Sequence, residues 1–165
     1  MQTLGYSGSE VTPTKIDSLN ELESLIRAVE SGFIIGKECE SPGHFWLLSV
    51  GEVRIGIVAE SRPIVQKLAH GHCILLDNKV HLFDENWSSK FGFKLDSQVY
   101  EVKDRARSLI IVHEVGVKSL SKSGDYEWNI NTDLIEDHKF DGDELVLTTE
   151  TGNARYSLIN GKPLH

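Results

Sequence analysis

The sequence predicts a predominantly antiparallel β protein of the α+β class, a sandwich or partly open barrel with one N-terminal amphipathic helix. Two observations support this fold class. Short apolar runs, bounded by turn residues such as Gly, Asn and Asp, recur from residue 44 to residue 159. One earlier segment, residues 17–32, has the apolar spacing of a helix instead.

The helical segment reads DSLNELESLIRAVESG. Ser18 and Glu21 form an S-x-x-E capping box, a pattern that favours the start of a helix. Apolar residues then recur at steps of three and four, so they form one stripe that a helix buries against its neighbours: Leu19, Leu22, Leu25, Ile26 and Val29. We expect Gly32 to end this helix.

Short β-type runs follow. HFWLLSV and VRIGIVA flank Gly51-Glu52, and Gly in the first central position suits a two-residue type II′ hairpin. HCILL and KVHLF flank Asp77-Asn78, and both residues tolerate the positive φ that a type I′ turn needs. The centre of RSLIIVHE is continuously apolar, which predicts a strand buried on both faces.

The last part of the chain continues this pattern. DYEWNI alternates, with Tyr126, Trp128 and Ile130 on one side. ELVLTT and ARYSLI flank a turn at residues 150–153, and Asn160-Gly161 marks another. Turn signals at such regular spacing favour antiparallel sheets.

At 165 residues the chain fits a single domain, residues 1–165. The charged stretch EVKDRAR, residues 101–107, is a candidate internal seam, although a solvated loop between strands has the same composition. A propeller is not expected, because the sequence shows no blade-sized repeat and is short even for four blades.

Composition limits the partners. The chain has 25 Asp and Glu against 17 Lys and Arg, a formal net charge of -8. Such a surface repels phosphate, so we expect no nucleic-acid partner and no membrane partner, whereas a basic protein partner suits it. The first residues lack a signal-peptide pattern and no apolar stretch approaches the ~20 residues of a membrane span, so a cytoplasmic protein is expected.

Residues 69–85, AHGHCILLDNKVHLFDE, concentrate histidines in one predicted hairpin. A two-residue loop at Asp77-Asn78 sets its register: Leu76 opposite Lys79, Ile74 opposite His81, and His72 opposite Phe83. His72 and His81 then lie diagonally on one face, roughly 7–8 Å apart, and are candidate metal ligands. Zinc needs a third and usually a fourth ligand, so a hairpin with a polar face is the alternative, and we expect no cofactor.

Residues 133–144, DLIEDHKFDGDE, gather acidic side chains around an Asp-Gly turn. The EF-hand arrangement is absent, which leaves a solvated turn or a patch that meets a basic partner. The candidate partner-binding residues of this segment are Asp133, Glu136, Asp137, Asp141 and Asp143. Trp87 lies in the polar segment DENWSSK and is a further candidate as an aromatic anchor, unless it plugs the end of the sandwich.

The sequence therefore favours a non-enzymatic, acidic, cytosolic protein-binding module, of the inhibitor or immunity-protein kind, that uses an acidic loop surface. The alternative is a small hydrolase or lyase with a histidine-lined, metal-optional pocket in a β-barrel, built from His72, His81 or His113. An enzyme requires three or more ionisable groups that converge in a concave pocket. A purely structural subunit would instead show a large, self-complementary apolar surface.

Overall fold

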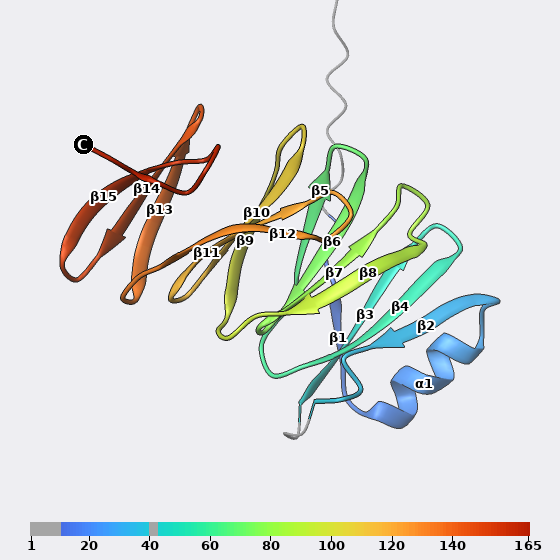
Figure 1. Ribbon diagram of the computed structural model, residues 1–165. Coiled ribbons are helices and arrows are strands. Elements are labelled where there is room, and N and C mark those ends of the chain that lie inside the picture. Colours follow the sequence, from blue (N-terminus) through green and yellow to red (C-terminus); the bar gives the residue numbers. More distant parts are fainter. Residues whose placement is uncertain (1–10, 40–42) are drawn as a thin grey trace, which may run out of the picture. The chain divides into compact units, whose positions relative to one another are not determined.

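The computed structural model describes residues 11–39 and 43–165. The fold is mostly β: the described residues contain one short helix and sixteen strands, arranged in four sheets of four (Figure 1). The chain divides into two compact units, the first up to Val65 and the second from Gln66 to His165. No helix within the described ranges is long and apolar enough to cross a membrane.

The first unit is one sheet with a helix on it. Its strand order is β1-β3-β4-β2, with β2 parallel to β4 and the other neighbours antiparallel. The elements are β1 (Thr14–Ile16), α1 (Leu19–Arg27), β2 (Ser31–Ile35), β3 (His44–Val50) and β4 (Val53–Ala59). A Cβ at Gly56 would lie 3.2 Å from Leu22 of the helix, so glycine in β4 allows α1 to pack closely on the sheet.

Helix α1 starts where the capping box indicates, because the backbone N–H of Glu21 donates to the Ser18 hydroxyl oxygen at 3.2 Å. It ends earlier than expected. The last helical residue is Arg27, and Gly32 is a residue of β2 rather than the helix stop. A Cβ at Gly32 would lie only 2.6 Å from the carbonyl oxygen of Ile26, so glycine is needed there to let β2 pass the end of the helix.

The second unit, together with the first two residues of β5, consists of three consecutive four-stranded meanders, coloured green, yellow to gold, and orange to red in Figure 1. Meander I contains β5 (Ile64–Leu68), β6 (Gly71–Leu76), β7 (Lys79–Phe83) and β8 (Ser89–Lys94). Meander II contains β9 (Val99–Asp104), β10 (Ser108–His113), β11 (Gly116–Ser121) and β12 (Tyr126–Asn131). Meander III contains β13 (Ile135–Asp141), β14 (Glu144–Thr149), β15 (Gly152–Ser157) and β16 (Pro163–Leu164).

Strand β10 joins two cores of the second unit, because each of its faces is buried in a different one. Leu109 and Ile111 belong to the core shared with meander I, where they join Cys73, Leu75, Val80 and Leu82. Ile110 and Val112 belong to the core shared with meander III, where they join Ile135, Leu145, Leu147 and Leu158. The predicted burial of RSLIIVHE on both faces is confirmed.

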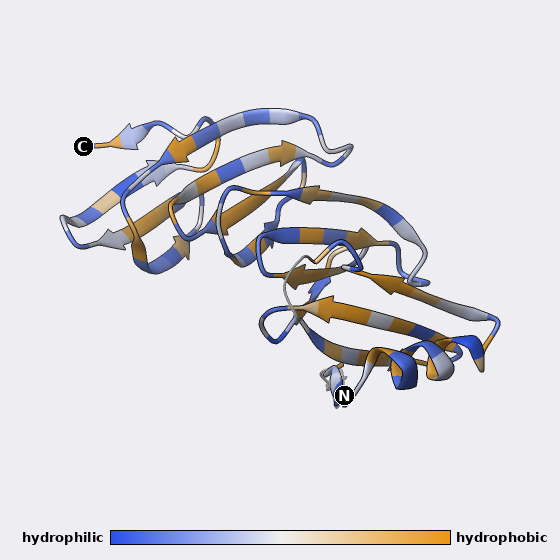
Figure 2. Cartoon of the chain, turned by 90° about the horizontal axis from the view of Figure 1, so that it is seen from below, coloured by the Kyte–Doolittle hydropathy of each residue, from blue (hydrophilic) through white to orange (hydrophobic). Residues whose placement is uncertain are grey.

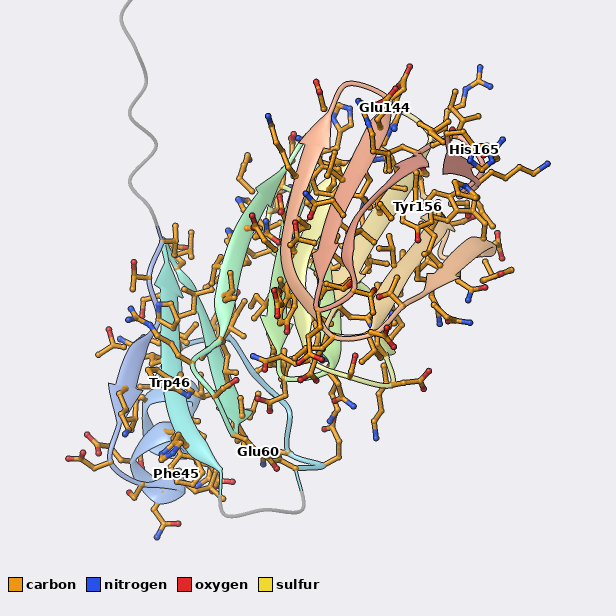
Figure 3. The ribbon with its side chains drawn as sticks, turned by 90° about the vertical axis from the view of Figure 1, so that its left-hand side faces the viewer. Phe45, Trp46, Glu60, Glu144, Tyr156 and His165 are labelled. Carbon is orange, nitrogen blue, oxygen red and sulfur yellow. The ribbon has the colours of Figure 1, made fainter. Side chains whose placement is uncertain are left out.

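The outer face of meander III is polar. Leu145 and Leu147 of β14 point into the core, whereas Val146 between them lies opposite Lys139 and Arg155 on the other face. Arg155 also forms an ion pair with Glu144 on this side. Figure 3 labels Glu144 on β14 and Tyr156 on the neighbouring β15, and Figure 2 colours the chain by hydropathy, with hydrophilic residues along much of the C-terminal strands. The inner face of meander III therefore covers a core, whereas its polar outer face resembles that of a capping repeat.

The sandwich or partly open barrel is not confirmed. The described strands form separate sheets of four, and in the second unit each meander packs face to face on the next. Sheets of this form resemble propeller blades, contrary to the expectation from the absence of a blade-sized repeat in the sequence. Sequence patterning could not show where one sheet ends, because the connections between meanders, residues 95–98 and 132–134, are as short as hairpin loops.

Both predicted two-residue hairpins are present. Val50 pairs with Val53 around Gly51-Glu52, and Leu76 pairs with Lys79 around Asp77-Asn78, with the predicted register. Only Asp77 of the second loop has a positive φ, 53°, so the turn is not the type I′ expected. The turn expected at residues 150–153 is shorter, because Thr149 already pairs with Gly152.

The candidate seam at residues 101–107 lies inside meander II, where it forms the end of β9 and the turn into β10. The described residues divide instead at Val65/Gln66. A single domain over residues 1–165 therefore stays a prediction.

Replacing Ile111 by Ala should lower the free energy of unfolding by about 2–5 kcal/mol, because it opens a cavity in a shared core. Val146→Ala is the matched control on the polar face of meander III and should cost less than about 1 kcal/mol. Urea unfolding followed by tryptophan fluorescence measures both values. Equal losses for the two variants would contradict the burial of β10 in two cores.

Candidate functional site: the acidic end of the second unit

Five connections at one end of the three meanders share one property. Turns of a meander alternate between its two ends, so the turns β6–β7, β10–β11 and β14–β15 lie at the same end as the connections β8–β9 and β12–β13. Each of the five contains one acidic residue and no Lys or Arg: Asp77, Asp96, Glu114, Asp133 and Glu150. We call these five connections, residues 77–78, 95–98, 114–115, 132–134 and 150–151, the acidic end.

Backbone hydrogen bonds tie successive connections of the acidic end together. They run from Leu95 N to Asn78 O (2.7 Å), Val99 N to Asp77 O (2.8 Å), Glu114 N to Gln98 O (2.9 Å) and Thr132 N to Val115 O (3.1 Å). Ile135 N donates to Glu114 O at 2.8 Å, and Ile135 pairs with Thr149 beside the last turn. The positions of these acids are therefore set by a continuous backbone network.

The opposite end of the meanders has balanced charge. Its connections carry four acids, Asp84, Glu85, Asp125 and Asp143, and four bases, Arg105, Arg107, Lys122 and Lys162. Two of these bases form ion pairs: Arg105 with Asp143 at 2.5 Å, and Lys122 with Asp104 of β9. The connections of the acidic end thus carry five acids and no base, whereas those of the opposite end carry no net charge. Lys79 and Lys94, at the ends of the adjoining strands β7 and β8, border the acidic end.

Two apolar side chains are exposed within the acidic end. Val115 is 39% exposed and Leu134 is 44% exposed. Their connections are neighbours, because Thr132 N donates to the carbonyl of Val115. We call Val115 and Leu134 the apolar pair. Apolar side chains bordered by polar ones are a common composition for a protein-binding surface.

The acidic segment predicted as one loop surface is divided between the two ends. Residues 135–141 form β13, because Phe140 and His138 pair with the core residues Leu145 and Leu147 of β14. The exposed side chains of Asp133, Glu136 and Asp137 lie at or next to the acidic end, whereas Asp141 and Asp143 lie at the opposite end.

Sequence reasoning missed most of the acidic end, namely Asp77, Asp96, Glu114, Glu150 and the apolar pair. The pattern that indicates these residues is an acid in every second connection between consecutive strands. That pattern is visible only once the strands are assigned.

Trp87 is buried rather than presented to a partner. It is 4% exposed and stacks on His72 with 4.0 Å between ring centroids. Asp84 holds its loop, because one carboxylate oxygen accepts from the backbone N–H of Asn86 and of Ser88, each at 2.9 Å. Trp87 therefore fills the end of meander I, and its proposed use as an exposed anchor is withdrawn.

The two candidate metal ligands lie on one face of the β6–β7 hairpin, as their register predicts. The His72 ring packs on Trp87, and burial lowers the pKa of His72. Cys73 faces the core, where burial raises its pKa to about 12. Within residues 11–39 and 43–165, no group of three or more His, Cys, Asp or Glu side chains is arranged to hold a metal ion. His72 and His81 thus supply two candidate ligands without a third from the described chain.

His113 is the histidine that lies at the acidic end. It is 8% exposed, and its Nδ1 lies 2.8 Å from the hydroxyl oxygen of Ser97 in the β8–β9 connection. Burial, and secondarily the charge of Lys118, lowers the pKa of His113, against an opposing effect of Asp96. This contact braces β10 to the neighbouring connection. His72 lies at the opposite end of the meanders, so these two histidines do not converge.

No protein-family model and no curated protein matches the chain. BamB from Moraxella catarrhalis is a similar solved structure, with a TM-score of 0.51, 9% identity, and coverage of 81% of this chain and 51% of that one. Hsv2 from Kluyvelomyces marxianus has a TM-score of 0.50 and 13% identity, over 72% of this chain and 41% of that one. The chain thus spans about half the length of these structures or less. The likeness shows the fold alone, a β-rich, propeller-like arrangement of four-stranded sheets.

His113 should make stability depend on pH. Its folded pKa lies below the unfolded value of about 6.5, so the unfolded chain binds the proton first. The stability that neutral His113 contributes is present above about pH 6.5 and is lost as the pH falls through the folded pKa.

His113→Gln should therefore flatten the fall in the free energy of unfolding between about pH 7 and about pH 5. Urea unfolding across this range measures the slope, with the exposed His165→Gln as control. A wild-type slope in His113→Gln would show that His113 is not buried in its neutral form.

Proposed function

We propose that the protein is a non-enzymatic binding module that holds a basic protein partner at the acidic end of its second unit. The observation that carries this proposal is the charge pattern, with an acid and no Lys or Arg in each of five neighbouring connections. The net charge of -8 and the propeller-like fold support it. The role of an inhibitor that covers a basic surface is one form of this proposal.

The arrangement suits electrostatic recognition. Negative charges that lie on one side of a protein attract a basic partner over about one Debye length, about 8 Å at physiological salt, and raise the rate of encounter. The backbone bonds between the connections position these charges before the partner arrives. Binding therefore does not have to order flexible loops, which lowers its entropic cost.

The same charge pattern argues against nucleic acid and anionic membranes as ligands of this surface, because their phosphates would be repelled. A cytoplasmic location is part of this proposal.

A hydrolase remains the second candidate, and one contact favours it. The Ser97 hydroxyl lies 2.8 Å from Nδ1 of His113, within the distance of a nucleophile and its base. Ser97→Ala would abolish such an activity, whereas it should leave partner binding within about two-fold of wild type if the contact is only a brace.

The first test uses a partner captured from lysate of the native source, eluted with salt and identified by mass spectrometry. Its affinity is then measured for the triple variant Asp133→Asn, Glu136→Gln, Glu150→Gln, all exposed positions at or next to the acidic end. Loss of three attractive charges should weaken binding by about 10- to 100-fold at low salt and should reduce the salt dependence.

The matched control is the triple variant Glu30→Gln, Glu52→Gln, Glu85→Gln, which makes the same charge change at exposed positions that do not belong to the acidic end. It should bind with nearly wild-type affinity. Equal weakening by both triple variants would mean that only net charge matters, and the proposed binding surface would be rejected.

A further inference from the structure

The apolar pair gives the acidic end a contact that charge alone does not supply. We propose that the segment bound there is basic and amphipathic, with one apolar side chain placed on Val115 and Leu134 and with Lys or Arg residues on both sides of it. This inference rests on the proposed function and specifies the chemistry of the partner.

Backbone hydrogen bonds hold together the two connections that carry the apolar residues. Thr132 N donates to Val115 O at 3.1 Å, and Ile135 N donates to Glu114 O at 2.8 Å. The β10–β11 turn and the β12–β13 connection are therefore fastened to each other on either side of the pair. Because these bonds fix the backbone of both connections, a bound side chain does not have to order it, which lowers the entropic cost of binding.

The charges next to the pair select the occupant. Glu114 directly precedes Val115, and Asp133 directly precedes Leu134, so each apolar residue has a carboxylate beside it in the chain. A purely apolar or an acidic segment would cover these carboxylates without pairing them, which is costly. A segment with an apolar residue between cations pairs both carboxylates and also covers the apolar pair.

The other exposed apolar residues of the second unit, Tyr126, Ile159 and Leu164, lie in or next to connections that contain a Lys, either Lys122 or Lys162. Tyr126 also has carboxylates beside it, from Asp125 and Glu127, but the connection that precedes it is not purely acidic. Ile159 is 71% exposed and lies in the β15–β16 connection at the opposite end, where the charged residue of its connection is Lys162. Exposure alone would favour Ile159 over the apolar pair as a contact. The charge pattern favours the pair, and Ile159 therefore provides a matched control.

The test uses two synthetic peptides rich in Lys and Arg that differ at one central residue, Leu in one and Ser in the other. Fluorescence anisotropy at low salt measures the affinity of each peptide for the full chain. Wild-type protein should bind the Leu peptide about ten-fold more tightly, as expected from burial of part of one leucine side chain.

The double variant Val115→Ser, Leu134→Ser should lose this preference and keep the weaker, salt-dependent binding of both peptides. Ile159→Ser should keep the preference. Val115→Thr, which nearly preserves side-chain shape, should reduce the preference in part, and it gives the same comparison if the double variant does not fold.

The outcomes separate this inference from the proposed function. Equal binding of the two peptides by wild type, weakened by the Asp133, Glu136 and Glu150 triple variant, would overturn the apolar contact and leave the acidic surface in place. No binding of either peptide at low salt would overturn both. A preference that is lost in Ile159→Ser but kept in the double variant would move the contact to the opposite end.

Discussion

The burial of both faces of β10 is the constraint on which the second unit depends. One strand contributes Leu109 and Ile111 to one core and Ile110 and Val112 to another, so meander II must lie between meanders I and III. Stacking in this order brings alternate connections of all three sheets to the same end. The acidic end is therefore a consequence of sheet stacking, combined with an acid in each of those connections.

This arrangement explains how a charge pattern spread from Asp77 to Glu150 becomes one surface. The net charge of the whole chain does not show where its acidic residues gather. The connections at the opposite end of the meanders, for example, carry as many bases as acids. The fold brings the acids of alternate connections to one end of the meanders, which the overall composition does not indicate. The outer face of meander III carries charges of both signs, such as the Glu144–Arg155 pair. The acidic end differs from it because the connections there contain acids only.

Local features of the fold could be predicted from the sequence because their causes are local. The Ser18 cap, the Gly51-Glu52 loop and the register of the histidine hairpin depend on residues a few positions apart. Other features depend on residues far apart in the chain, among them the boundaries between sheets and the end of α1 at Arg27. Strand β2 after the helix forms by pairing with β4, and Trp87 is buried because it stacks on His72. The charges of residues 133–144 predicted a loop, because a highly charged segment does not show the apolar alternation of a strand. The segment nevertheless forms β13, which pairs with β14.

Amide chemical shifts test most directly whether ligands bind at the acidic end. A Lys- and Arg-rich peptide titrated into isotopically labelled protein should shift amide signals in residues 77–78, 95–98, 114–115, 132–136 and 150–151 together. Shifts confined to the connections at the opposite end, such as residues 84–88 and 105–107, or spread evenly over exposed acids throughout the chain, would contradict the account.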